Sequence, residues 1–327
     1  FKKAGGLIHA LSQDVRPDAL IVQDLAAIEL ARQAGFGGEI HLSTLAAVTT
    51  GGDVALAAKI KGVNRVVLPR ELNIDEIKQV AANCPGNMQL EVFVHGALCY
   101  GVSGRCYWSS FLGGKSGLRG RCVQPCRRMY TQGKNAGRLF SCLDFSVDVL
   151  TKILLDIPEI AAWKIEGRKK GAHYVYYTTL AYQLLRDHGA DPRMKKTALA
   201  YLENALGRPT THYNFLPQRP FAAANTGKQT GSGMLVGRVS GGGKNSAISP
   251  RIKLFKGDRL RIGYEDQPGH HTYKTPKSIP ARGRLHLTLS GTKPPEKGTP
   301  VFLIDRLEAA LNKKIKVLAD ALEDEHK

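Results

Sequence analysis

The chain has 327 residues, of which 43% are hydrophobic, so it is long enough for a large core and about two domains. No run of about eighteen apolar residues occurs and no signal peptide is visible, which excludes a transmembrane helix and favours a cytoplasmic protein without a membrane partner. The formal net charge of +19 is large for a metabolic enzyme and favours a polyanionic partner.

Residues 1–189 alternate short apolar segments with segments of helical character. Strands are predicted at residues 19–24, 39–44, 64–68, 90–94, 139–143 and 162–165. Helices are predicted at residues 25–33, 54–61, 74–83, 147–155 and about 174–188. Asn73 is expected to cap the third of these helices, because Glu76 stands at the capping-box position. The alternation implies a parallel sheet with helices packed outside it.

A loop at residues 96–130 follows the strand at 90–94 and holds four of the six cysteines. Gly96 is expected to end the strand, and the glycines that follow let the chain turn tightly. The spacing is C-x6-C-x15-C-x3-C, and the residues are Cys99, Cys106, Cys122 and Cys126. Irregular chain of this composition is costly to order unless a bound centre or a partner stabilises it.

Three roles are open for these cysteines. Disulfides or buried free thiols are one, although a chain of this size is not a small disulfide scaffold. Zinc binding is a second, but structural zinc sites favour close cysteine pairs at both ends, and only the second pair is close here. Four thiolates on an irregular loop also suit an iron–sulfur cluster, and the spacing favours that role over the first two.

Basic residues are concentrated in two tracts that contain no acid. Residues 92–143 hold eight Lys or Arg and no Asp or Glu, and the same counts apply to residues 204–257. One tract surrounds the cysteines, so the sequence predicts an electropositive approach to that loop. The phosphate backbone of a nucleic acid is the natural partner for such a surface.

The remainder of the chain is predicted to contain a linker and a second domain. Residues 190–230 are polar and rich in proline, with one helix expected at 195–206. From residue 231 short alternating segments predict a small β-barrel or sandwich with a charged helix at its end, residues 306–327. Its many Lys and Arg residues suit a module that faces nucleic acid, and a solubilising or dimerising appendage is the alternative.

Three long motifs occur in order between residues 18 and 182: EVFVHGALCYGVSGRCYWSS, RGRCVQPCRRMY and WKIEGRKK. In these motifs the chain resembles peptidase family U32, the collagenase-like peptidases. The resemblance implies a TIM-type (β/α) barrel, of which about six strands are visible and the first strands are expected to be missing from this chain. It also implies a [4Fe–4S] cluster on the four cysteines, with zinc as the alternative metal.

The resemblance implies an activity as well. Several members of the family are oxygen-independent hydroxylases of a base in tRNA or rRNA or of ubiquinone precursors, and others keep the peptidase name. We therefore expect an enzyme that hydroxylates a base in structured RNA with a small-molecule oxygen donor. A peptidase is the alternative, although no H-E-x-x-H or G-x-S-x-G motif occurs. An RNA-binding protein with a structural cluster is a third possibility, and the oligomeric state is open.

Polar side chains at the carboxyl ends of the predicted strands are the candidate site, because a barrel places its chemistry there. The candidate catalytic residues are His95, Lys164, Glu166 and Arg168. The candidate substrate-binding residues are His41, Arg70, Glu71, Arg119 and Arg127.

Each of these candidates has a structural alternative. Lys164 and Arg168 are expected to bind an anionic group that Glu166 helps to orient. The alternative for Lys164 is a buried ion pair with Glu166 or Asp144. His41 is the least certain candidate, because a histidine within a strand can equally be a satisfied residue of the core.

Overall fold

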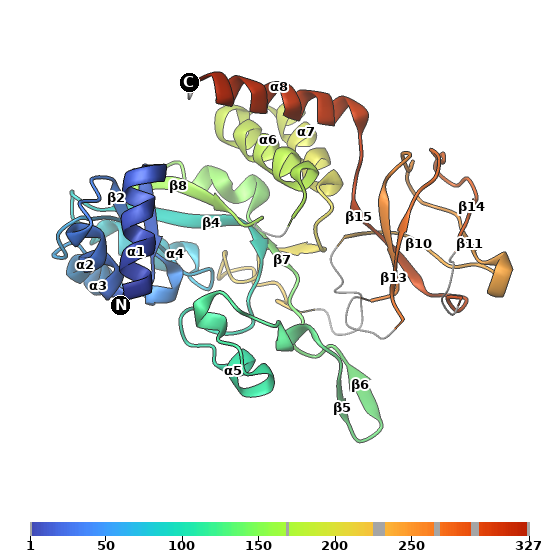
Figure 1. The fold of residues 1–327 in the computed structure, drawn as a ribbon, viewed down its shortest axis with the longest axis horizontal. Helices are drawn as coiled ribbons and strands as arrows, with labels where there is room; N and C mark the ends of the chain where they lie inside the picture. Colours follow the sequence, from blue (N-terminus) through green and yellow to red (C-terminus); the bar gives the residue numbers. More distant parts are fainter. Residues whose placement is uncertain (1, 168–169, 225–232, 265–268, 289–293, 326–327) are drawn as a thin grey trace.

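A computed structural model describes residues 2–167, 170–224, 233–264, 269–288 and 294–325 (Figure 1). The larger part of the molecule is a mixed α/β unit with a mostly parallel sheet, and the smaller part is antiparallel β-structure; each has its own core. The α/β class and the small β domain are thereby confirmed, whereas the boundaries at residues 189 and 230 stay predictions. Arg168 lies outside the described residues.

The larger sheet has seven strands in the order β1-β2-β3-β4-β7-β9, and β8 also pairs with β4. All of these pairs are parallel except β4 with β7. The strands are β1 (Ala19–Val22), β2 (Glu39–Leu42), β3 (Val63–Val67), β4 (Gln89–Ala97), β7 (Asp144–Ser146), β8 (Ile160–Ile165) and β9 (Thr210–Thr211). Among the described residues the pairings form an open path and do not close, so the barrel is not confirmed.

Capping residues explain where the helices between the first four strands begin. They are α2 (Leu25–Gln33), α3 (Gly51–Ala57) and α4 (Ile74–Ala82). At α4 the side chain of Asn73 accepts the N–H of Glu76 (3.0 Å), and the Glu76 carboxylate accepts the N–H of Asn73 (2.8 Å), which confirms the predicted capping box. α3 begins before the predicted residue 54, because Thr50 and Asp53 form a second capping box there.

Three predicted elements differ in the structure. Gly96 does not end the strand: it lies within β4 at a φ of 140°, and a Cβ there would stand 2.5 Å from the Cβ of Glu166. The strand expected at 139–143 is displaced to β7, and Cys142 contributes only an isolated bridge to Ala224. The helix expected at 147–155 is a 3₁₀ helix, Asp148–Ile153.

The long predicted helices are present, as is a helix at the start of the chain, where the sequence also has helical character; several short elements were not predicted. α6 (Ala172–His188) and α7 (Pro192–Asn204) pack against each other, and α8 (Ala309–Glu325) lies along them in Figure 1. The chain begins with α1 (Lys2–Ala10) and a π-helical turn, Leu11–Val15. The cysteine loop contains α5 (Trp108–Gly113), and a hairpin projects after it, formed by β5 (Tyr130–Gln132) and β6 (Asn135–Gly137) (Figure 1).

The smaller part contains an antiparallel sheet in the order β10-β15-β12-β13 and a separate pair, β11 with β14. Its strands are β10 (Met234–Arg238), β11 (Ala247–Ile248), β12 (Arg259–Ile262), β13 (His271–Lys274), β14 (Leu285–His286) and β15 (Pro300–Asp305). Valine, leucine and isoleucine side chains from these strands and their connecting segments form the second core, together with Leu206. In the described part of the chain, no helix has the length and apolar character needed to cross a membrane.

Candidate functional site

The cysteine loop brings its four thiols within electrostatic reach of one another. Cys99 and Cys122 are exposed, and Cys106 and Cys126 are half-buried. Burial raises the pKa of Cys99, and the neighbouring Cys106 and Cys122 raise it further. Burial raises the pKa of Cys126 to about 11, and Cys99 and Cys122 contribute to the same shift while Arg127 opposes it. The same interactions also reach the Cys142 thiol, so this electrostatic neighbourhood holds the four predicted ligands together with a fifth cysteine.

Hydrogen-bond donors surround one of these sulfur atoms. The hydroxyl of Ser109 in α5 and the backbone N–H of Gln124 each donate to Cys122 Sγ at 3.4 Å. The same Ser109 hydroxyl accepts the N–H of Val123 at 3.1 Å, so α5 is fixed beside Cys122. Such donors stabilise a thiolate and tune a bound metal centre.

Two predicted substrate-binding residues anchor this loop to the sheet. Glu71, just after β3, accepts the N–H (2.7 Å) and the hydroxyl (3.0 Å) of Ser103. Arg127 donates to the carbonyl of Leu98 at 3.1 Å and also to the carbonyl of Cys142. Both side chains therefore hold the loop in place. The sequence offered no signal for these contacts, because Ser103 lies 32 residues from Glu71 and Leu98 lies 29 residues from Arg127.

A row of charged side chains crosses one face of the sheet. The strand register places His41 beside Arg65, and it places Phe93 beside Lys164. Glu39 accepts from His41 Nε2 (2.7 Å) and lies 3.6 Å from Arg65, which also approaches Glu91 at 3.9 Å. His41 is only 5% exposed, so the structure places it in a buried contact within this row.

Lys164 ends this row in an ion pair with Glu91 of β4. The alternative partners considered from the sequence, Glu166 and Asp144, are occupied elsewhere. Glu166 pairs with Arg70 (2.9 Å), whose guanidinium also stacks 3.7 Å from the centre of the Phe93 ring. The structure therefore brings Arg70, Lys164 and Glu166 to neighbouring positions at this end of the sheet.

We expect Lys164→Ala to lower the free energy of unfolding by about 1–3 kcal/mol, because the nearly buried carboxylate of Glu91 loses its closest partner. Chemical denaturation measures this change. Adding Glu91→Gln to the Lys164→Ala variant should recover part of the lost stability, because this second substitution removes the unpaired carboxylate. The exposed Lys152→Ala serves as the matched control, with an expected change within about 0.5 kcal/mol. An unchanged stability in Lys164→Ala would show that its ion pair with Glu91 contributes nothing to folding.

His95 lies in a buried polar cluster. Its Nδ1 is 3.2 Å from the hydroxyls of Ser146 and Tyr182, and Tyr182 donates to the carbonyl of Val94 at 2.7 Å. The ring is 2% exposed, and burial lowers its pKa to about 4. This arrangement is that of a satisfied core histidine on β4, four residues before Cys99.

Sequence reasoning missed the most buried ion pair of the site region. Asp144, the first residue of β7, is 1% exposed and pairs with the guanidinium of Arg208 at 3.2 Å. It also accepts the backbone N–H of Arg208 at 3.1 Å. An Asp directly after an apolar run was a visible signal, but its partner lies 64 residues later in the chain.

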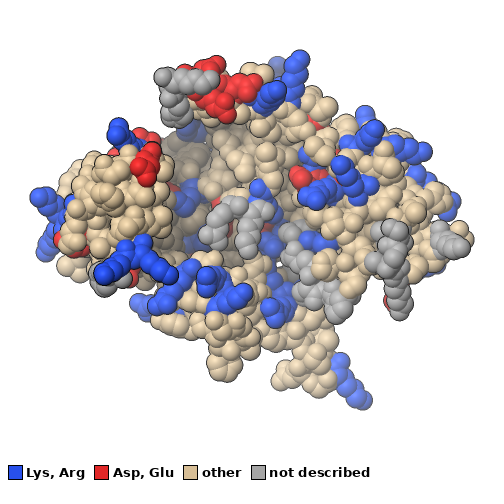
Figure 2. Space-filling model, viewed as in Figure 1, with Lys and Arg blue, Asp and Glu red and all other residues tan. Residues whose placement is uncertain are grey.

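Arg119 is exposed in a 3₁₀ turn of the cysteine loop, where basic side chains gather on the face shown in Figure 2. Further basic side chains cover the C-terminal domain in the same view. The guanidinium of Arg138, after the hairpin, lies 4.2 Å from the centre of the Tyr264 ring, so the two parts of the molecule touch here.

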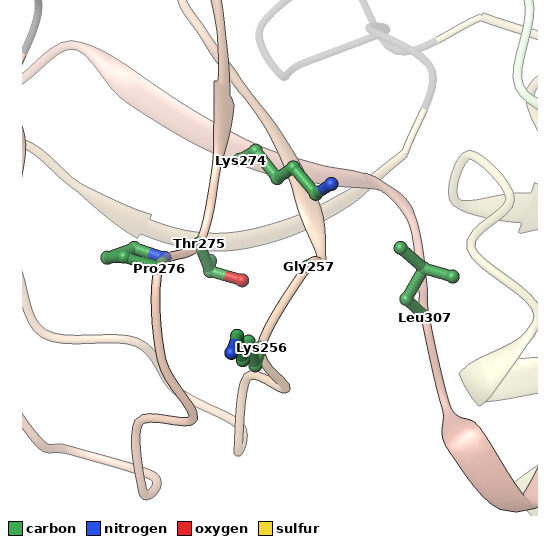
Figure 3. A pocket seen from close by; sticks show the side chains of 6 residues that line it. All are labelled: Lys256, Gly257, Lys274, Thr275, Pro276 and Leu307. Atoms are coloured by element: carbon green, nitrogen blue, oxygen red, sulfur yellow. The ribbon is translucent and has the colours of Figure 1, made fainter.

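The C-terminal domain contains a pocket of about 400 Å³ (Figure 3). It is lined by Lys256, Gly257, Lys274, Thr275, Pro276 and Leu307. Both lysines are exposed, so this pocket offers two cations to an anionic group. It contains none of the predicted site residues.

The donor set of the cysteine loop fits an iron–sulfur cluster in its chemistry. Four thiols stand on one loop, N–H and O–H donors face Cys122, and no acid occurs in residues 92–143. Among the described residues, no three His, Cys, Asp or Glu side chains stand close enough together to hold a single metal ion. The loop would therefore have to draw its thiols closer around a bound cluster.

The model of peptidase family U32 matches residues 2–225, which is more than half of the chain. This chain belongs to peptidase family U32. The predicted resemblance is thereby confirmed, and the matched region contains the whole parallel sheet and all six cysteines.

Relatives in this family carry two kinds of name. An uncharacterized protease of Methanocaldococcus jannaschii is 37% identical over 51% of this chain and 43% of its own length. A tRNA hydroxylation protein P of Helicobacter pylori is 30% identical over 65% of this chain and 54% of its own. A 23S rRNA 5-hydroxycytidine synthase of Escherichia coli is 36% identical over 52% of this chain and 26% of its own.

The chain thus spans about half the length of the first two relatives and about a quarter of the third. No solved structure matches it significantly.

Proposed function

We propose that this U32 protein takes part in the oxygen-independent hydroxylation of a base in tRNA or rRNA. The observation that carries the proposal is the pair of relatives named for tRNA hydroxylation and for 5-hydroxycytidine synthesis in 23S rRNA. The net charge of +19 and the acid-free basic tract around the cysteines support an RNA partner.

Cys99, Cys106, Cys122 and Cys126 are the proposed ligands of a [4Fe–4S] cluster, with zinc as the alternative. A bound cluster would supply an iron centre able to position or activate a small-molecule oxygen donor. The chain's own contribution is to hold the loop through Glu71 and Arg127 and to supply cations near it. Lys164 and Arg70 are the proposed contacts for an anionic group, with Glu166 as the residue that orients Arg70. Arg168 and His95 remain further candidates from the sequence.

Anaerobically purified protein is expected to be brown and to contain about four iron atoms per chain. Cys122→Ser should lose most of the colour and iron, because it removes a proposed ligand. Cys84→Ser is the matched control, since Cys84 lies outside the loop, where its thiol donates to the carbonyl of Met88. Visible absorption and iron analysis measure both variants. Colourless protein with one zinc per chain would contradict the cluster.

Mass spectrometry of nucleosides from total tRNA and rRNA tests the activity. In a strain lacking this protein, we expect one hydroxylated nucleoside to disappear and its unmodified parent to appear. The wild-type chain, expressed with whatever further segments its gene encodes, should restore the modification, and the Cys122→Ser variant should not. An unchanged nucleoside profile in the deletion strain would refute the proposed function.

Proteolysis is the second candidate, because one relative is named as a protease and another as a collagenase. The described residues contain a Ser–His contact, between Ser146 and His95. Both residues are only 2% exposed, however, and Ser146 also contacts Tyr182 at 3.1 Å. A peptide carbonyl cannot reach a serine in that position, so the geometry gives this candidate little support. Cleavage of gelatin by the purified protein, abolished by Ser146→Ala, would reverse this ranking.

A further inference from the structure

Two aromatic rings on the cysteine loop are exposed on one short helix. Tyr107 is the N-cap residue of α5, and Phe111 lies four residues further on. Both side chains therefore project from the same short helical segment. Their exposed fractions are 67% for Tyr107 and 88% for Phe111, the highest value among the large hydrophobic residues that the structure describes. Neither ring contributes its apolar surface to the fold.

Two other side chains of α5 hold the helix in place. Trp108 packs against Tyr130 and Phe140, with ring centres 5.7 and 5.2 Å apart, and Tyr100 contacts the same Phe140 at 5.2 Å. Ser109 binds Cys122 from the same helix. The exposed rings therefore stand on a fixed support that is directly connected to one of the four cysteines.

Cationic side chains without acidic partners lie on the same loop and its hairpin. Six exposed Lys and Arg residues lie on the loop and its hairpin: Arg105, Lys115, Arg119, Arg121, Arg128 and Lys134. Within the described residues none of the six takes part in an ion pair. Exposed aromatic rings beside cations that have no acidic partner are typical of surfaces that bind single-stranded nucleic acid. The rings stack on bases, and the cations bind phosphates. An apolar protein partner would not require this concentration of positive charge.

We propose that the cysteine loop binds an unpaired segment of RNA, in which one base stacks on Tyr107 and Phe111. This inference rests on the proposed function and specifies that the RNA binds the site in single-stranded form. A base in a duplex is covered by its neighbours, whereas a base that is to be modified must leave the stack and expose its face. Ser109 connects the same helix to Cys122, so the proposed stacking surface and the proposed cluster belong to one loop.

Binding of short RNAs to the full chain tests the proposal. The probes are a labelled single strand of about ten nucleotides and a duplex of the same sequence. We expect tighter binding of the single strand, and a loss of roughly 5- to 150-fold in affinity for Phe111→Ala and for Tyr107→Ala. A 2-aminopurine base in the strand should be quenched on binding, because its fluorescence falls when it stacks, and Phe111→Ala should weaken that quenching.

Three control variants distinguish ring stacking from general apolar contact. Phe111→Trp should preserve the affinity, whereas Phe111→Leu should lose it although it keeps an apolar side chain. Leu322→Ala removes an exposed apolar side chain from α8 and should leave binding unchanged. Equal binding of strand and duplex, or full affinity in Phe111→Ala, would overturn the proposal. So would concentration-dependent self-association that Phe111→Ala abolishes while RNA binding persists, because the rings would then form a protein interface.

The binding test and the nucleoside test can contradict their two proposals separately. If Phe111→Ala binds RNA normally but deletion of the gene removes a hydroxylated nucleoside, the stacking surface is wrong and the proposed function stands. If the rings bind single strands as expected but no nucleoside changes, the activity is wrong and the binding surface stands.

Discussion

Asp144→Ala is expected to destabilise the protein by about 3–5 kcal/mol, because it leaves the guanidinium of Arg208 buried without its carboxylate. Chemical denaturation of purified protein measures the change. Asp156→Ala replaces an exposed aspartate and should shift stability by no more than about 0.5 kcal/mol. Arg208→Met in the Asp144→Ala chain removes the guanidinium from this buried position and should recover part of the loss. Equal stabilities of the two aspartate variants would mean that the pair contributes nothing to folding.

The same aspartate also makes stability depend on acid pH. Burial raises the pKa of Asp144, but Arg208, Lys170 and the backbone N–H of Arg208 together outweigh burial and lower it. A carboxylate with a lowered pKa contributes stability above its unfolded value of about 3.9, and this is lost as the pH falls through the folded value. The stability that Asp144 contributes is therefore lost only below about pH 3.9.

His95 is expected to produce the second large effect, at a higher pH. Burial lowers its pKa from 6.5 to about 4, with Asp144 opposing this shift and Lys170 adding to it. Between these two values the unfolded chain binds a proton that the folded chain does not. Stability should therefore fall as the pH is lowered from about 6.5 to about 4, by about 3 kcal/mol in total.

The contribution of His95 is the difference between the pH dependence of the unfolding free energy in the wild-type protein and that in His95→Gln. His173 and the proposed cluster affect both proteins alike, so their contributions cancel in this difference. Burial lowers the pKa of His173 as well, so His173 contributes a slope of the same sign. The slope of unfolding free energy against pH should be smaller in His95→Gln between pH 4 and 6.5. Parallel slopes in the two proteins would show that His95 is solvated and titrates normally.

Local signals in the sequence predicted the strands and helices of the first 95 residues closely. Asn73 and Glu76 define the start of α4, and the strands β1, β2 and β3 begin within one residue of their predicted positions. These elements depend on nearby residues: a cap, an apolar run or a turn. Gly96 was interpreted in the same way and was wrong, because its conformation serves the close approach of Glu166 from another strand.

Elements that depend on distant partners could not be predicted. The apolar run at residues 139–143 resembles a strand, but the carbonyl of Cys142 is bound by the guanidinium of Arg127, and a continuous strand begins only at Asp144. The partner of Lys164 is set by the register between β4 and β8, which brings Glu91 within reach from 73 residues away. No local sequence pattern specifies the register between these two strands.

The anchors of the cysteine loop use none of its four thiols. Glu71 holds the loop at Ser103 through a backbone N–H and a hydroxyl, and Arg127 binds the carbonyls of Leu98 and Cys142. The loop is thus tied down without committing a proposed ligand. If the proposed cluster binds here, iron and sulfide would have to be delivered to a segment that these side chains already hold.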